Sequence, residues 1–215
     1  MTTVIATPIS QIKLAPGSAI SILGLTWKTY EALLQELGND RLTRLAYDQG
    51  MLEIRMPGEL HEIINRLLAK IITMLAMELG MEANDFGSTT LNRESLDRGI
   101  EPDSCFYIQN AEPGQGLETK GTESLAPDLV LEVDIANSSA NKLAIYKAIG
   151  VPEIWLFSRN GLKIWVLQTG QYLEADRSRS FPLVSAQQLN HWLELRRTET
   201  DLTVLREVQR FCKAR

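Results

Sequence analysis

Residues 127–157 have the sequence PDLVLEVDIANSSANKLAIYKAIGVPEIWLF, and this stretch decides the fold class. Its first part predicts a strand, because apolar residues recur at every second position and side chains alternate between the faces of a strand. One face is wholly apolar, and the other carries three carboxylates around a valine: Asp128, Val130, Glu132 and Asp134. A helix is predicted to begin at Asn137 or Ser138 and to end at Gly150. Residues 153–157 form a short continuous apolar run, which predicts a central strand.

The N-terminal part predicts a helix and a β-hairpin. Residues 1–20 show no sustained period, and residues 1–25 are expected to form a loosely packed arm. Thr26 is a suitable N-cap for a helix through Leu37. Residues 41–57, RLTRLAYDQGMLEIRMP, contain two alternating runs around Asp48-Gln49-Gly50 and therefore predict a hairpin.

The strongest helical period follows, and it ends at Gly80. Its apolar positions recur at the spacing of an amphipathic helix over five turns: Leu60, Ile63, Ile64, Leu67, Leu68, Ile71, Ile72, Leu75 and Leu79. Residues 81–92 are a candidate strand, and residues 99–108, GIEPDSCFYI, are a better one.

The C-terminal part predicts a second hairpin and two helices. Asn160-Gly161 is the best short-range hairpin signal in the chain, and residues 171–175 are a candidate edge strand. Ser185 has the capping-box spacing to Gln188. A last helix from about Thr200 is expected to place four residues on one stripe: Leu202, Leu205, Val208 and Cys212. Residues 26–215 are predicted to form a single domain, with residues from about 196 as a helical extension.

Composition is that of an ordinary globular protein of 215 residues. The chain is expected in the cytoplasm, because no segment suits a signal peptide or a membrane span and the two cysteines form no thiolate motif. The net charge of −5 argues against bulk attraction to nucleic acid. A local basic groove stays open beside the alternative of scattered surface charges, since arginines cluster in pairs: Arg41 and Arg44, Arg93 and Arg98, Arg177 and Arg179, Arg196 and Arg197.

From residue 59 onward the predicted order is helix, strand, strand, strand, helix, strand. Within this order the chain resembles the PD-(D/E)XK nuclease superfamily, and more narrowly its Uma-type restriction endonuclease family. The resemblance is carried by EPDSCFYI and by APDLVLEVDIANSSANKLAIYKAIGVPEIWLF, and it covers roughly residues 26–195. It implies an α/β fold with a restriction-endonuclease-like core, a mixed central sheet flanked by helices.

The resemblance also implies a divalent-metal nuclease. It makes Asp103 and Glu132 the ligands of Mg²⁺, with Mn²⁺ as a substitute, and Glu62 on the first helix an auxiliary catalytic residue. Independently of the family, hydrolysis of a phosphodiester develops charge on oxygen, and a hard cation bound by two or three carboxylates neutralises it. DNA is the expected substrate, and a symmetric dimer would suit cleavage of a duplex.

One position departs from the superfamily pattern. Asp134 stands two residues beyond Glu132, where the motif has its lysine. Lys142 on the following helix is expected to stand in, with Tyr146 on the same face. Asp134 would then be either a further metal ligand or the mark of a lost activity.

Several candidates have a plain structural alternative. The carboxylates of residues 128–134 would also suit the watery face of a half-exposed sheet. Asp128 suits local backbone donors better than a metal, and Glu62 suits the helix dipole. A cap or surface position is favoured for His61, and packing is favoured for four other residues: Tyr107, Trp155, Trp165 and His191.

Three functions compete. The first is a metal-dependent endonuclease that hydrolyses DNA. The second is a nuclease-fold binding or scaffold protein without catalysis, favoured by Asp134 and by the acidic net charge. A hydrolase of another small phosphate or ester is the weakest, because the chain has neither a glycine-rich phosphate loop nor a Ser/His/Asp arrangement.

Overall fold

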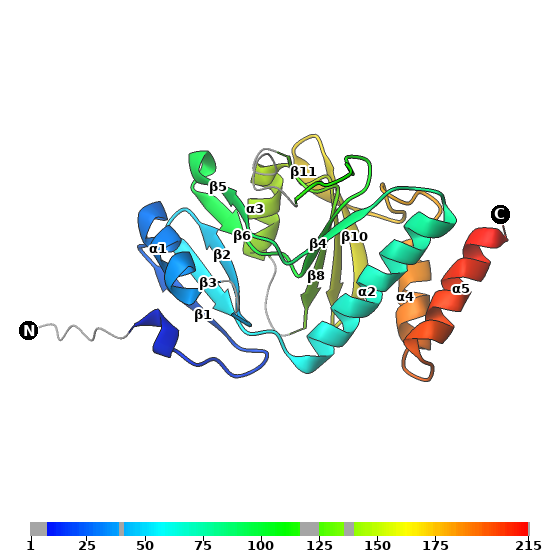
Figure 1. The fold of residues 1–215 in the computed structure, drawn as a ribbon, viewed down its shortest axis with the longest axis horizontal. Coiled ribbons are helices and arrows are strands. Elements are labelled where there is room, and N and C mark those ends of the chain that lie inside the picture. The colour runs from blue at the N-terminus through cyan, green and yellow to red at the C-terminus, as the bar shows by residue number, and fades with distance from the viewer. Residues whose placement is uncertain (1–7, 39–40, 117–124, 136–139, 215) are drawn as a thin grey trace, which may run out of the picture.

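The computed structural model describes residues 8–38, 41–116, 125–135 and 140–214. Two β-sheets lie next to each other, and helices cover their outer faces (Figure 1). No helix within these residues is both long and apolar enough to cross a membrane.

The first sheet is antiparallel and has five strands in the order β1-β3-β2-β6-β5. Its strands are β1 (Ala19–Leu23), β2 (Arg44–Asp48), β3 (Met51–Arg55), β5 (Leu91–Arg93) and β6 (Arg98–Ile100). The predicted hairpin is therefore confirmed. Its turn has positive φ at both Gln49 and Gly50, which matches the twist of the paired strands.

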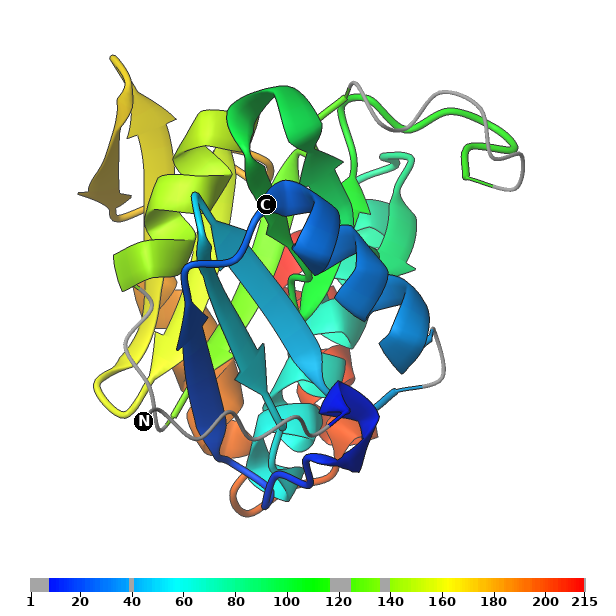
Figure 2. The same ribbon diagram turned by 90° about the vertical axis from the view of Figure 1, so that its left-hand side faces the viewer.

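The helix α1 (Trp27–Leu37) packs on this sheet, as Figure 2 shows from the side of the sheet. Thr26 caps it by accepting the N–H of Thr29, as predicted. Stacked rings of Tyr30 and Tyr47, with centroids 4.8 Å apart, join helix and sheet. The 3₁₀ turns η1 (Ile9–Gln11) and η2 (Glu94–Leu96) complete this half.

The expectation of a loosely packed arm was wrong for part of residues 1–25. Strand β1 pairs with β3 over five residues, and Ile9 is buried against the same core. The apolar residues of the segment follow no sustained period, and the partner strand lies about thirty residues away in the sequence.

The second sheet has six strands in the order β11-β10-β9-β8-β7-β4. Its strands are β4 (Asn84–Gly87), β7 (Ser104–Tyr107), β8 (Leu129–Asp134), β9 (Glu153–Ser158), β10 (Gly161–Gln168) and β11 (Gln171–Ala175). Only β8 and β9 pair in parallel, through the crossover helix α3 (Ala140–Ile149), so the sheet is mixed as expected. The hairpin at Asn160-Gly161 and the edge position of β11 are also confirmed. The predicted N-cap at Asn137 or Ser138 lies outside the described residues.

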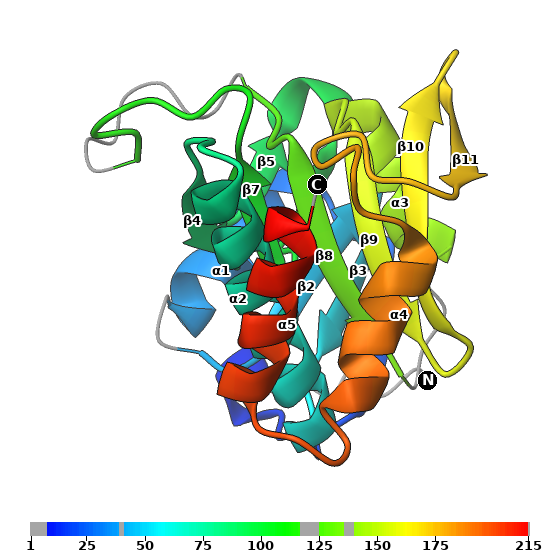
Figure 3. The same cartoon turned by 90° about the vertical axis from the view of Figure 1, so that its right-hand side faces the viewer.

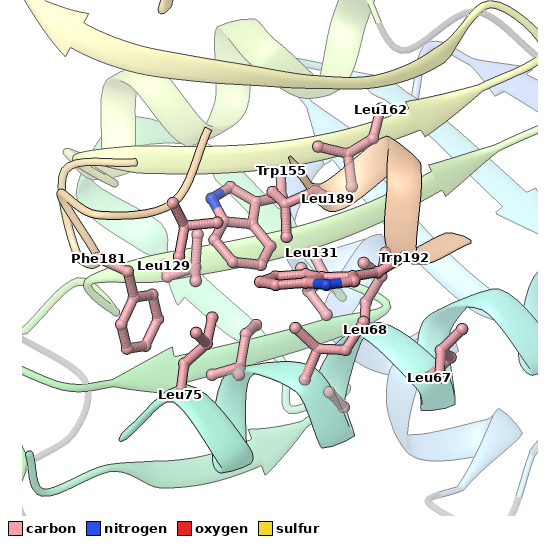
Figure 4. Close-up of a cluster of buried hydrophobic side chains, with 14 of the residues drawn as sticks. Leu67, Leu68, Leu75, Leu129, Leu131, Trp155, Leu162, Phe181, Leu189 and Trp192 are labelled. Atoms are coloured by element: carbon pink, nitrogen blue, oxygen red, sulfur yellow. The ribbon is translucent and has the colours of Figure 1, made fainter. Parts of the chain in front are cut away.

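Three helices cover one face of the second sheet: α2 (Glu59–Glu78), α4 (Ala186–Leu195) and α5 (Asp201–Lys213). Figure 3 shows α4 and α5 side by side in front of the strands. Between them and the sheet lies the main core, which contains Leu68, Leu131, Trp155 and Trp192 (Figure 4). The opposite face of the sheet packs against α3 and the first sheet through Val130, Ile145 and Ile100.

Two predictions about these elements need correction. Residues 99–108 do not form one strand, because β6 belongs to the first sheet and β7 to the second. The stripe on α5 is also shifted: Leu202 is exposed, and Val204 faces the core together with Val208. Leu202 lies in the first turn of α5, where its side chain is exposed.

Candidate functional site

Glu132 lies in the middle of β8, on the face that α3 and the first sheet cover. The neighbouring residues Leu131 and Val133 point into the main core on the other side. Only 1% of Glu132 is exposed, and Asp128 and Asp134 are buried too. The alternative of a half-exposed sheet with a watery face is therefore excluded, because both faces of β8 are covered.

Asp103 was expected on a strand. It lies instead in the short connection between the two sheets, just before β7. Its carboxylate accepts the backbone N–H of Val133 at Oδ2, at 2.7 Å. This bond places Asp103 next to the residue that follows Glu132. The chain change between sheets thus brings the two predicted carboxylates together.

Lys142 and Tyr146 hold the Glu132 carboxylate from one face of α3. Lys142 Nζ donates to Oε2 at 2.6 Å, and the Tyr146 hydroxyl donates to Oε1 in a short hydrogen bond. Their i, i+4 spacing places both donors on the same side of the helix, as predicted. The structure therefore brings Asp103, Glu132 and Lys142 into one cluster.

Arg55, the last residue of β3, is a member of this cluster that the sequence did not reveal. Its Nη2 lies 2.8 Å from Asp103 Oδ1 and 3.6 Å from Glu132 Oε2. Its Nη1 donates to the carbonyl of Val133 at 3.3 Å. No local pattern marks this residue, because its partners lie 48 and more positions away.

The first turns of α2 contribute His61 and Asn65. His61 Nε2 lies 2.8 Å from Asp103 Oδ2, an ion-pair distance, although no aligned hydrogen bond of the ring is found among the described residues. Asn65 donates to the carbonyl of Asp103 at 3.1 Å and accepts the hydroxyl of Ser104. His61 is thus buried against the carboxylates, and the expectation of a cap or surface position was wrong.

The surroundings shift the pKa values of the two carboxylates in opposite directions. Burial raises the pKa of Asp103, but the contact with His61 and the charge of Arg55 outweigh it, so the net shift is downward. The pKa of Glu132 is raised by burial and by the charge of Asp103, against the opposing charges of Lys142 and Arg55. Asp103 therefore stays ionised, whereas Glu132 holds a proton more readily.

Burial and the charge of Glu132 raise the pKa of Tyr146 well above its ordinary value. The hydroxyl therefore keeps its proton and remains a donor to Glu132.

Asp134, Glu62 and Asp128 occupy different surroundings. Asp134 ends β8 and lines a cavity of about 280 Å³ with Arg55 and His61. Glu62 is 40% exposed and lies 3.9 Å from Arg66 and 3.6 Å from His61 Nδ1, outside the carboxylate cluster. Asp128 accepts the N–H groups of Ile108 and Asn110. This is the structural role favoured for Asp128 from the sequence.

The donor set suits a hard divalent cation. Mg²⁺ takes one or two carboxylates and keeps several waters, and two carboxylates here face one point. Arg55 Nη2 lies at that point, which demonstrates that a positive charge fits between them. Within the described ranges no three His, Cys, Asp or Glu side chains are grouped as metal ligands, so the ion would depend on Asp103, Glu132 and water.

The clustered arginines are mostly engaged with nearby acceptors. Arg41 pairs with Glu101, Arg98 with Asp48, and Arg196 with Asp201. The Arg41 pair is nearly buried and the other two are partly exposed, and arginines neutralised in this way favour scattered charges over a basic groove. Of the four residues for which packing was favoured, Tyr107 and Trp155 are buried and Trp165 partly so, but His191 is exposed.

A larger groove of about 620 Å³ lies apart from this cluster, between α2, α4 and the β9–β10 turn. Its lining includes Ile63, Phe157, Asn190 and Leu193, and none of the carboxylates of the cluster.

Comparison with known proteins gives a family match and a similarity in fold to solved structures. The model of the Uma2 family, described as "Putative restriction endonuclease", matches residues 27–204. A solved structure titled "putative nuclease belonging to DUF820", from Anabaena variabilis ATCC 29413, is similar in fold with a TM-score of 0.57. The match has 17% identity and covers 79% of this chain and 99% of the other. No curated protein matches the chain.

Proposed function

This chain belongs to the Uma2 family, and on that premise we propose that it is a divalent-metal-dependent nuclease that hydrolyses DNA. The mixed second sheet with α2 on one face and α3 on the other is taken as its restriction-endonuclease-like core. The order of α2, β7, β8, α3 and β9 supports this assignment.

The convergence of Asp103 and Glu132 carries the proposal. Each carboxylate approaches the same nitrogen of Arg55, at 2.8 and 3.6 Å, although one comes from an inter-sheet connection and the other from mid-strand. Burying two carboxylates side by side is unfavourable unless cations answer them. A site that accepts this cost is a candidate for cation-dependent chemistry.

In the proposed mechanism Asp103 and Glu132 would hold Mg²⁺ or Mn²⁺. The bound ion would lower the pKa of a water and neutralise the charge that develops on the phosphate. Lys142 orients the Glu132 carboxylate and adds fixed positive charge, and Tyr146 holds the second oxygen of Glu132. A phosphodiester would approach through the cavity lined by Arg55, His61 and Asp134, which is the opening beside the cluster.

DNA is proposed as the substrate because of the family description. The net charge of −5 and the paired arginines suggest few phosphate contacts, so binding is expected to be weak.

The test is plasmid nicking in Mg²⁺ or Mn²⁺ by the wild type and by Glu132→Gln. The variant is expected to lose at least ~100-fold of the rate, because the ion supplies several kcal/mol of transition-state stabilisation. Far-UV circular dichroism checks that the variant is folded. Glu174→Gln, which alters an exposed pair with Lys163, is the matched control and should nick at the wild-type rate. Undiminished nicking by folded Glu132→Gln would reject the site.

The second function, a nuclease-fold binding protein without catalysis, has one observation in its favour. Every carboxylate oxygen of Asp103 and Glu132 already has a donor within the protein. Wild-type protein that leaves plasmid, single-stranded DNA and RNA intact with both metals would favour this alternative.

A further inference from the structure

The guanidinium of Arg55 lies where a cation that bridges Asp103 and Glu132 would lie. Nη2 contacts an oxygen of each carboxylate, and Nη1 donates to the Val133 carbonyl between Glu132 and Asp134 on β8. Burial lowers the pKa of Arg55, but the charges of Asp103, Glu132 and Asp134 outweigh it and raise the pKa above its ordinary value. The group is therefore a permanent cation in the cluster.

We propose that Arg55 is an internal competitor for the metal: it bridges the two carboxylates in the metal-free protein and moves to Asp134 when a divalent cation enters. The inference rests on the metal binding proposed above. The guanidinium and the ion cannot share one position, both because their volumes overlap and because like charges repel strongly in a buried site.

The structure offers a short route for this movement. Glu132 and Asp134 are two positions apart on one face of β8, so their Cα atoms are separated by about 6.6 Å. The Val133 carbonyl that Arg55 already contacts lies between these two residues. The cavity of about 280 Å³ is lined by Arg55 and Asp134 themselves, so the side chain has room to turn toward the carboxylate.

This role also accounts for the residue that departs from the superfamily pattern. Where related motifs carry a lysine on the strand, this chain has Asp134 on the strand and Arg55 on β3 of the other sheet. Arg55 adds a second positive charge next to the carboxylates, beside that of Lys142, and Asp134 provides the second partner of Arg55. The two carboxylates are thus neutralised by Arg55 in the metal-free protein and by the metal ion in the metal-bound protein, in which Arg55 pairs with Asp134.

The experiment measures Mn²⁺ affinity by calorimetry and melting temperature with EDTA or Mn²⁺. Arg55→Gln is expected to bind Mn²⁺ roughly 10-fold more tightly, because the competitor is gone. In EDTA it should melt roughly 10 °C below the wild type, since two buried carboxylates lose their bridge, and Mn²⁺ should restore most of the loss. Arg55→Lys keeps the positive charge but not the paired N–H donors of the guanidinium. It should therefore melt at a higher temperature than Arg55→Gln in EDTA, and its Mn²⁺ affinity should lie between those of the wild type and Arg55→Gln. Arg98→Gln, which removes a half-exposed pair with Asp48, is the control and should leave the Mn²⁺ affinity unchanged.

Asp134→Asn tests whether Asp134 receives the guanidinium of Arg55 when the metal ion displaces it. In the wild-type background it should weaken Mn²⁺ binding, because the displaced guanidinium loses its partner. In the Arg55→Gln background, Asp134→Asn should weaken Mn²⁺ binding less, since only the loss of one negative charge remains. The double-mutant cycle on Mn²⁺ affinity then measures the coupling between Arg55 and Asp134.

The outcomes separate this inference from the proposed function. If the wild type binds Mn²⁺ and both Arg55 variants bind it no more tightly, Arg55 is not a competitor and the inference fails alone. If Glu132→Gln binds Mn²⁺ as the wild type does, the proposed metal site itself is wrong. Equal effects of Asp134→Asn in both backgrounds would reject Asp134 as the receiving partner.

Discussion

Glu153 begins β9 with no exposed surface, and protein donors surround its carboxylate. Oε1 accepts the indole N–H of Trp155 at 2.8 Å and the N–H of Arg179 at 3.1 Å. Oε2 accepts the N–H of Ser180 at 2.7 Å. These three bonds fasten the segment after β11 to the central strand, so this carboxylate has a structural role that the apolar run EIWLF did not indicate.

At the residue scale, Glu153→Ala is expected to lower the free energy of unfolding by about 3 kcal/mol or more, because it leaves buried N–H donors without acceptors. Urea unfolding followed by tryptophan fluorescence measures this change. The same experiment on Glu174→Gln should show a change below about 0.5 kcal/mol. Similar stabilities for the two variants would contradict the role assigned to Glu153.

The sequence predicted those residues of the candidate site that belong to a motif. Asp103, Glu132 and Lys142 lie together as the sequence suggested, although Asp103 lies just before β7 and not on a strand. Arg55 was not predictable, since an arginine after an alternating strand is ordinary on a protein surface.

The C-terminal helices are attached to α2 by both apolar and charged contacts. Val204 and Val208 of α5 belong to the main core. Asp201, in the first turn of α5, lies 2.6 Å from Lys70 on α2 and 2.5 Å from Arg196. The bonds to Lys70 and Arg196 lower the pKa of Asp201.

At the element scale, Asp201→Asn is expected to reduce stability at pH 7 by about 0.5–1 kcal/mol, a small value because solvent screens this partly exposed group. A lowered folded pKa means that the ionised form stabilises the fold. The difference between wild type and variant should therefore be constant above about pH 5 and vanish as the pH falls through the folded pKa, below about 4. Urea titrations at several pH values test this, and a difference that persists at pH 2.5 would exclude the ionised carboxylate as its cause.

The carboxylate cluster lies where the two sheets meet, and both sheets and two helices contribute to it. Arg55 comes from the first sheet, Glu132 from the second, Lys142 from α3 and His61 from α2. The ion-paired cluster therefore also joins the two halves of the molecule. Beside it, Cys105 of β7 packs with Ile100 and Ile145 in the apolar layer between them.

At the scale of the whole molecule, Cys105 reports whether the two sheets separate. It is fully buried, and burial raises its pKa to about 12. In a Cys212→Ser background, a disulfide reagent at pH 8 should label it at least ~1000-fold more slowly than in the unfolded chain. The urea dependence of labelling should follow the loss of tryptophan fluorescence. Labelling that precedes this loss would mean that the sheets open before the main core unfolds.

The sequence by itself determined the elements and their order. Helix caps at Thr26, Ser185 and Thr200 and the hairpin turn at Gly161 are local, because the bonds that define them join residues within a few positions. Periods of 3.6 and 2 residues likewise reflect which face of a single element is covered. These features, and the family, follow from short stretches of chain.

Only the tertiary structure decided how the two sheets meet. It divided residues 99–108 between them, added β1 to the first sheet, and placed Arg55 and His61 against Asp103. The physical reason is that these contacts join residues separated by tens of positions, so they depend on packing of whole layers and leave no periodic trace in the sequence.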